Sequence, residues 1–106
     1  MTPTPGSDTI QLRRYEMVEG TFADFRDWWM TTLVPVREAA GFTVVSASVS
    51  DDESEFVWTV SAPGSRDEFL ALEAVYLASD ARARAFAGQP KRVAEMHLSF
   101  VTAVTW

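Results

Sequence analysis

The stretch FTVVSASVSDDESEFVWTVSA, residues 42–62, contains two strand patterns joined by a short polar turn. Its first part is rich in valine, threonine and serine, which is typical of strands. In its last part, Phe56, Trp58 and Val60 occur at every second position and therefore share one face. The turn at residues 51–54 is acidic and short. The stretch predicts a β-hairpin in the middle of the chain.

Helix and strand patterns lie on both sides of this hairpin. Before it, apolar residues within 22–40 are spaced three or four positions apart, which predicts a helix with one buried stripe. After it, Ser65 and Glu68 have the spacing of a capping box, which predicts the start of a second helical region. Alternating patterns near the two ends of the chain predict two further strands, at residues 9–17 and 94–105.

The resulting order, β-α-β-β-α-β, is that of a ferredoxin-like α+β fold. Such a fold is a sandwich in which a four-stranded antiparallel sheet carries its helices on one face. The other face would be open to water, and we expect it to carry several of Tyr15, Met17, Val45, Val57 and Val101. Because an exposed apolar face of this size usually binds a partner, we expect a homodimer formed through the open sheet face.

Length and composition exclude several classes of protein. The chain has 106 residues, so we assign residues 9–106 to one domain and expect residues 1–8 to be a disordered lead. The absence of cysteine excludes disulfides and thiol catalysis, and the formal net charge of −6 argues against nucleic acid or an anionic membrane as a partner. With no secretory signal and no apolar run of membrane-spanning length, we expect a cytoplasmic protein, and the excess of arginine and alanine suggests a bacterial one.

Four segments of the chain, in this order, resemble the NIPSNAP family of the dimeric α/β-barrel superfamily. They are LRRYEMVEG (12–20), VPVREAAGF (34–42), SEFVW (54–58) and YLAS (76–79). The resemblance implies that two ferredoxin-like subunits pack their sheets face to face as a dimeric α/β barrel, with a cavity between the sheets or beneath each one. It also implies a range of chemistries, because superfamily relatives use such cavities for cofactor-independent oxygenation of polyphenols, polyketide cyclisation, dehalogenation or haem breakdown.

Three polar side chains are the candidate catalytic residues: His97, Arg13 and Tyr15. We expect Arg13 and Tyr15 on the non-helical face of the first strand, and His97 with Glu95 on one face of the last strand, so that both strands edge the same cavity. Arg13 would then orient a carboxylate or enolate, Tyr15 would donate a hydrogen bond, and His97 would act as general base. The alternative is structural: Arg13 pairs with Glu95 across the sheet, and His97 is an ordinary strand residue.

The candidate substrate-binding residues are Trp58, Glu95, Tyr76 and Trp28. Trp58 suits either a core face or the wall of a pocket for a flat aromatic ligand, and Trp28 widens the buried face of its helix. We expect no metal site, because the acidic residues 51–55 lack the spacing of a calcium loop. We also expect no cofactor: the chain contains no asparagine, which haem-degrading relatives use together with a tryptophan and a histidine.

These features suggest a small enzyme that acts on an aromatic or polyketide-like molecule, as a cofactor-independent monooxygenase or cyclase. The alternative is a non-catalytic dimeric module of the NIPSNAP type that binds a small apolar ligand or a protein. His97 distinguishes the two hypotheses, because the enzyme needs this side chain in a closed cavity, whereas the binding module can have it at solvent or under the helices.

Overall fold

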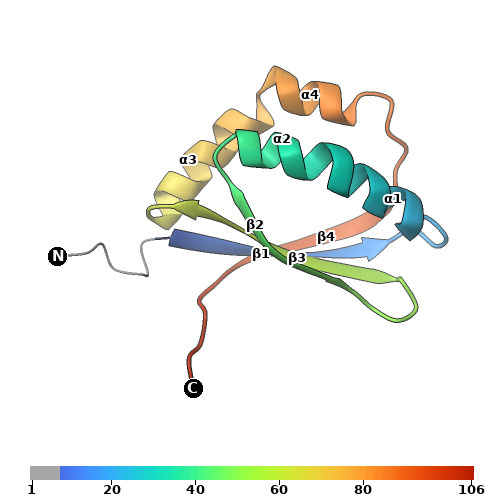
Figure 1. The fold of residues 1–106 in the computed structure, drawn as a ribbon, viewed down its shortest axis with the longest axis horizontal. Helices are drawn as coiled ribbons and strands as arrows, with labels where there is room; N and C mark the ends of the chain where they lie inside the picture. The colour runs from blue at the N-terminus through green and yellow to red at the C-terminus, as the bar shows by residue number, and fades with distance from the viewer. Residues whose placement is uncertain (1–7) are drawn as a thin grey trace.

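The computed structural model describes residues 8–106, which form a four-stranded antiparallel sheet with the helices packed on one face (Figure 1). The strands are β1 (Asp8–Met17), β2 (Thr43–Val49), β3 (Glu55–Pro63) and β4 (Val93–Val101). The helical segments are α1 (Phe22–Trp28), the π-helical η2 (Trp29–Leu33), α2 (Val34–Ala39), α3 (Arg66–Leu77) and α4 (Asp80–Phe86). The ferredoxin-like α+β prediction is therefore confirmed.

The strand order in the sheet is β2-β3-β1-β4, so the first and last strands are hydrogen-bonded neighbours. β1 lies at the centre and pairs antiparallel with both β3 and β4. Asp8, which we expected in a disordered lead, already belongs to β1, and residues 1–7 lie outside the described residues. None of the helices in residues 8–106 is long and apolar enough to cross a membrane.

The first helical region is divided into three segments that follow one another without a loop. Pro35 lies in the first turn of α2, directly after the π-helical segment. Proline has no backbone N–H to donate, and a wider π turn before it accommodates the missing bond. The region thereby continues past Pro35 and keeps Phe25, Trp29 and Leu33 buried against the sheet.

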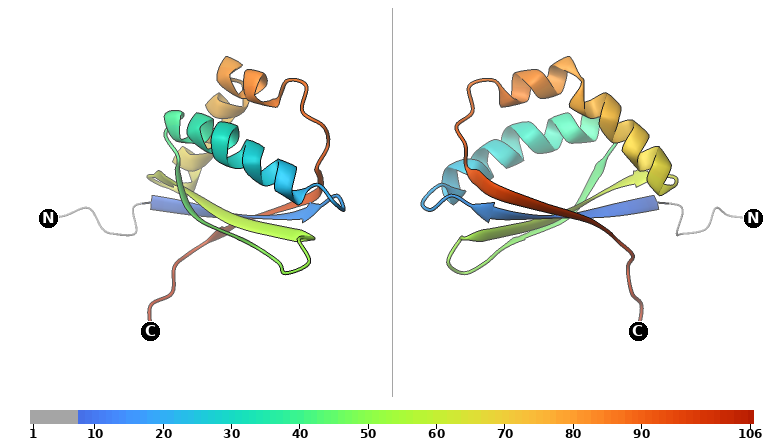
Figure 2. Two further views of the ribbon diagram at one scale, coloured as in Figure 1. Left: turned by 45° about the vertical axis from the view of Figure 1, so that its right-hand side comes forward. Right: turned by 180° about the vertical axis from the view of Figure 1, so that it is seen from behind.

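The second helical region begins as the capping-box pattern predicts. Ser65 Oγ accepts a hydrogen bond from the backbone N–H of Glu68 at 3.2 Å, and Glu68 Oε1 accepts one from the backbone N–H of Ser65 at 2.9 Å. After α3 the chain turns at Ser79, whose hydroxyl caps α4. α4 then lies above the sheet, beside α2, and leads through a loop into β4 (Figure 2).

The core lies between the sheet and the helices, and it corrects our assignment of the two faces of β1. Tyr15 and Met17, expected on the open face, are buried on the helical face. The reason is register: Tyr15 pairs with Phe56 and Arg13 with Trp58, so alternate residues of β1 share a face with the aromatic core of β3.

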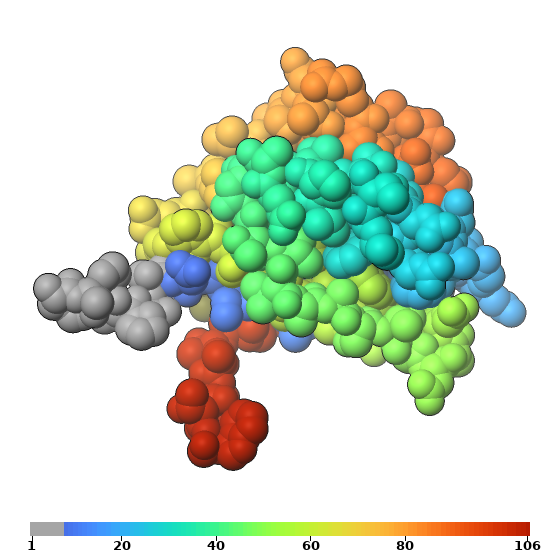
Figure 3. All heavy atoms as spheres, viewed as in Figure 1, coloured from blue at the N-terminus to red at the C-terminus, as the bar shows by residue number. Residues whose placement is uncertain are grey.

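The uncovered face therefore carries the other alternate set. On β1 this set is Ile10, Leu12, Arg14 and Glu16. Of the side chains expected here, Val57 lies opposite Arg14, Val101 lies opposite Ile10, and Val45 is more than half exposed beside them. Residues 102–106 leave the end of β4 as a tail that stands away from the body of the molecule (Figure 3).

Candidate functional site

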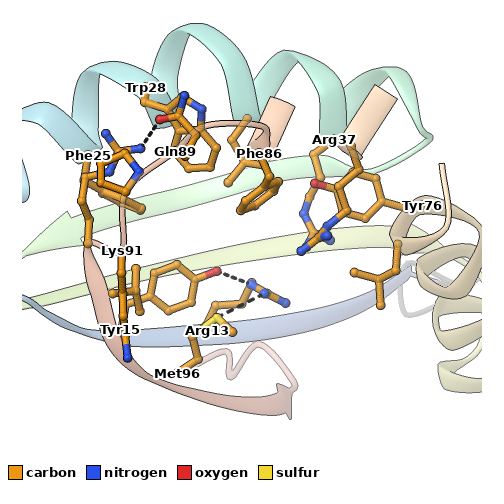
Figure 4. A pocket seen from close by; sticks show the side chains of 16 residues that line it. Arg13, Tyr15, Phe25, Trp28, Arg37, Tyr76, Phe86, Gln89, Lys91 and Met96 are labelled. Atoms are coloured by element: carbon orange, nitrogen blue, oxygen red, sulfur yellow. Dashed lines mark hydrogen bonds between the residues drawn. The ribbon is translucent and has the colours of Figure 1, made fainter. Parts of the chain in front are cut away.

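A cavity of about 350 Å³ lies between the sheet and the helices (Figure 4). Its floor is formed by side chains of β1 and β4, and its roof by side chains of the helices and of the loop between α4 and β4. Ten of the lining residues are labelled in the figure: Arg13, Tyr15, Phe25, Trp28, Arg37, Tyr76, Phe86, Gln89, Lys91 and Met96. A concave site of this size, lined by aromatic, aliphatic and polar side chains, is typical of small-molecule binding.

Aromatic rings form part of the wall, from Tyr15, Phe25, Trp28, Tyr76 and Phe86. Trp28 packs edge-on against Phe86 with the ring centroids 5.0 Å apart, and Trp28 Nε1 donates a hydrogen bond to the carbonyl of Ala85 at 3.1 Å. Tyr15 packs edge-on against Phe25 at 6.2 Å. These contacts fix the rings of the roof and the floor, so the wall is held in place before any ligand enters.

Of the two alternatives for Trp58, the structure shows the core position and not the wall of the cavity. Its side chain is 1% exposed and does not line the cavity. It packs against the rings of Tyr15 and Trp29 at 6.2 and 5.4 Å, and the guanidinium carbons of Arg13 and Arg37 lie 5.4 and 5.5 Å from its ring centroid. Trp58 is therefore a core residue that supports the arginines of the cavity.

Arg13 is held on the floor by a network of hydrogen bonds. Its Nε donates to Tyr15 Oη at 2.8 Å, and its Nη1 donates to Gln11 Oε1 at 2.7 Å. The same Nη1 lies 3.5 Å from Glu73 Oε2. Arg13 thus pairs with Glu73 of α3, which corrects the structural alternative in which its partner was Glu95.

Arg37 enters the cavity from α2. Its side chain is 3% exposed, and its Nη1 lies 3.4 Å from Glu73 Oε2. The guanidinium stacks over the ring of Tyr76 at 4.5 Å and over the ring of Phe42 at 4.8 Å. Burial, and then the nearby charge of Arg13, lower the pKa of Arg37. Burial also raises the pKa of the Tyr76 hydroxyl, which keeps that group a hydrogen-bond donor.

The cavity is strongly basic although the chain is acidic. Of the nine lysines and arginines in the chain, five line the cavity: Arg13, Arg37, Arg82, Lys91 and Arg92. Among the described residues, no aspartate or glutamate is part of the lining. Glu73 lies behind Arg13 and Arg37, and Asp24 forms an ion pair with Arg92 from outside the lining.

His97 does not share this cavity. β4 pairs with β1 so that His97 lies opposite Arg14, which places its side chain on the uncovered face of the sheet. The expectation that His97, Arg13 and Tyr15 edge one cavity is wrong. Arg14, the partner of His97, lies between Arg13 and Tyr15 on β1, and neighbouring positions of a strand point to opposite faces. Glu95 shares the uncovered face with His97 and does not line the cavity either.

The uncovered face has one group of side chains that could hold a cation. Ligand atoms of Glu16, Glu95 and His97 lie within 4.8 Å of one another in the described part of the chain. All three side chains are substantially exposed.

The cavity brings together four of the predicted site residues: Arg13, Tyr15, Trp28 and Tyr76. Arg37 and Arg82 also line it, and the sequence did not lead us to predict them. A signal for Arg37 exists: it stands four positions after Leu33, within the buried stripe of the helix. Arg82 lies in an alanine- and arginine-rich segment whose pattern favours a solvated face. The structure places its guanidinium 4.3 Å from the ring centroid of Phe86, at the cavity.

No protein-family profile matches this sequence, and no curated protein matches it. Solved structures are similar in fold. A NIPSNAP family protein of unknown function from Agrobacterium tumefaciens superposes with a TM-score of 0.79 at 11% identity, over 95% of this chain and 92% of its own. A NIPSNAP-like domain protein from Burkholderia xenovorans has a TM-score of 0.79 at 10% identity, over 94% of this chain and 88% of its own.

A candidate antibiotic biosynthesis monooxygenase from Bacteroides thetaiotaomicron is also similar, with a TM-score of 0.68 at 13% identity over 93% of this chain and 91% of its own. At identities this low the likeness is one of fold alone. The resemblance noted in the sequence is therefore confirmed as a likeness of architecture, and the chain has the ferredoxin-like fold of the NIPSNAP family proteins.

Proposed function

We propose that this protein binds an aromatic or polyketide-like small molecule in the cavity between its sheet and its helices. The observation that carries the proposal is the combination of fixed aromatic walls with Arg13 and Tyr15, whose polar atoms are already held 2.8 Å apart on the floor. Flat rings suit such walls, and a fixed guanidinium and phenol select the orientation of a polar substituent.

The catalytic form of the proposal is a cofactor-independent monooxygenase or cyclase. Guanidinium groups close to the cavity stabilise negative charge, so they favour the enolate or phenolate form of a bound substrate. In an oxygenation of this kind the substrate supplies the electrons: one atom of O₂ becomes a carbonyl oxygen on a ring methylene carbon, and the other leaves as water. The similar fold of the candidate monooxygenase from Bacteroides thetaiotaomicron supports this form.

The non-catalytic form is a binding module, and one observation favours it. Of the described residues that line the cavity, none is a histidine, an aspartate or a glutamate, which are common proton acceptors in catalysis. With His97 on the opposite face, an enzyme would have to rely on the arginines to lower the pKa of the substrate. A module that only binds its ligand needs no proton acceptor.

We also propose that the protein is a homodimer formed through the uncovered face of the sheet. Ile10, Leu12, Val57 and Val101 give this face an apolar part, and the tail of residues 102–106 ends in the fully exposed Trp106. Burying such a surface against a second copy would remove it from water.

Anthrone, a tricyclic aromatic ketone with an enolisable methylene group, tests both forms. Quenching of tryptophan fluorescence measures binding, and an oxygen electrode measures turnover to the quinone. We expect Arg13→Met to weaken binding about tenfold, whereas Arg26→Gln, on the exposed surface of α1, leaves it unchanged. Oxygen uptake that depends on Arg13 supports the enzyme, binding without uptake supports the module, and no binding contradicts the proposed site.

A further inference from the structure

The positive charge around the cavity is only partly neutralised. Arg13 and Arg37 are both buried, and both approach the same oxygen, Glu73 Oε2, at 3.5 and 3.4 Å. Two guanidinium groups therefore share one carboxylate. Because buried charges are normally paired, this arrangement has room for one more negative charge.

Four hydrogen-bond donors at the cavity also lack a good acceptor among the described residues, and one of them is Arg82 Nε. Arg37 Nε and Tyr76 Oη are fully buried and have no hydrogen-bond partner within residues 8–106. Among the same residues, Arg13 Nη2 has only Met96 Sδ as a partner, at 4.0 Å, and a thioether is a weak acceptor. Figure 4 shows the Arg37 side chain directed toward Tyr76, with Arg13 below them on the floor. Buried donors without acceptors destabilise a fold, so their presence together at a cavity points to an acceptor that the ligand brings.

The chemistry of the donors narrows the acceptor to a carboxylate. A guanidinium is planar and matches the two oxygens of a carboxylate, and a neutral phenol adds a single hydrogen bond. Part of the surrounding wall is aromatic, with Phe86 and Trp28 opposite the floor. These features together select a flat ring system that carries an acid group.

We infer that the ligand of this cavity is a planar aromatic carboxylic acid, bound as its anion with the carboxylate against Arg37 and Tyr76. The inference rests on the proposed function, since it assigns a ligand class to the same cavity. It adds a requirement that the proposed function does not make: a neutral ligand of the same shape must bind more weakly.

A matched pair of probes tests this requirement. 2-Naphthoate and 2-naphthamide have the same ring system and differ in the charge of one group. We expect isothermal titration calorimetry at neutral pH to show that wild-type protein binds 2-naphthoate at least tenfold more tightly than 2-naphthamide. Arg37→Met should reduce this preference to less than twofold, and the exposed control Arg26→Gln should retain it.

Tyr76→Phe gives a second test that does not depend on the folding of an Arg37 variant. The hydroxyl has no partner to lose within the described residues, so its removal should leave the melting temperature unchanged or raise it. The same change should weaken 2-naphthoate about threefold to tenfold. A group that only supports the core would not produce a loss of affinity without a loss of stability.

The outcomes separate the inference from the proposed function. Equal affinity for the two probes, or a preference that survives in both Arg37→Met and Tyr76→Phe, overturns the carboxylate assignment and leaves the aromatic site standing. If Arg37→Met does not fold, Arg37→Lys replaces it, and the loss of the planar guanidinium should still reduce the preference. If neither probe binds and anthrone does not bind, the proposed site itself is wrong.

Discussion

His97 and Glu16 form a hydrogen bond on the uncovered face of the sheet, with His97 Nε2 2.6 Å from Glu16 Oε2. Glu95 Oε2 lies 3.6 Å from the same nitrogen. The histidine of this chain therefore lies between two carboxylates on neighbouring strands, away from the cavity. Its chemistry belongs to the face on which we propose that two subunits meet.

The His97–Glu16 contact predicts a dependence of stability on pH. The hydrogen bond from His97 is the largest cause that lowers the pKa of Glu16 below its ordinary value of 4.5. A carboxylate with a lowered pKa in the folded state stabilises the fold at pH values above 4.5, and this contribution is lost as the pH falls from 4.5 through the lowered pKa. Chemical denaturation between about pH 6 and pH 3 should therefore show a smaller loss of stability in Glu16→Gln than in wild type. An identical acid dependence would contradict the contact.

A second prediction concerns the role of His97 in ligand binding. His97→Ala should change the affinity for 2-naphthoate by less than twofold, because the sheet separates this side chain from Arg13 and Tyr15. Fluorescence titration of the variant beside Tyr76→Phe gives the comparison. A loss of tenfold or more would show that the ligand reaches the uncovered face, and it would restore the histidine as a candidate base.

Most of the fold was predictable because its elements are marked locally. Alternation in Phe56, Trp58 and Val60 identifies β3, and Ser65 with Glu68 marks the start of α3 to the residue. The order of these elements then leaves few topologies, of which the ferredoxin-like arrangement is the familiar one.

The site was less predictable because it depends on which face of β1 is covered. Both alternate sets of β1 contain large apolar residues: Ile10 and Leu12 are on one face, and Tyr15 and Met17 are on the other. Alternation alone cannot show which of the two sets faces the helices. The outcome is decided by pairing with β3, whose partner residues are 39 to 55 positions away in the sequence. For the same reason the sequence led us to expect Arg13, a charged residue, on the open face.

Glu73 should be essential to the stability of the cavity. Glu73→Gln removes the negative charge that Arg13 and Arg37 share and leaves two buried guanidinium groups without a carboxylate. We expect the free energy of unfolding to fall by about 3 kcal/mol, measured by urea denaturation. Glu19→Gln, on the exposed loop after β1, is the control and should change it by less than about 0.5 kcal/mol.

A double variant checks the mechanism of that loss. Adding Arg13→Met to Glu73→Gln removes one of the two unmatched charges. The double variant should therefore lose less free energy of unfolding than the two single variants lose together. Strictly additive losses would show that Glu73 acts by packing and that its charge is not shared by the arginines.

The proposed dimer predicts a sharp difference between two faces of the molecule. Leu12 lies in the middle of the uncovered face, between Thr59 of β3 and Ser99 of β4, and Leu12→Lys would place a charge inside the interface. Val75, on α3, is 69% exposed, so Val75→Lys is a matched control on the helical side. Light scattering at micromolar concentration should show a dimer for wild type and for the Val75 variant. Leu12→Lys should raise the dissociation constant at least tenfold, because burying an unpaired ammonium is unfavourable. A monomeric wild type would instead leave Ile10, Leu12 and the tail of residues 102–106 as a surface for some other partner.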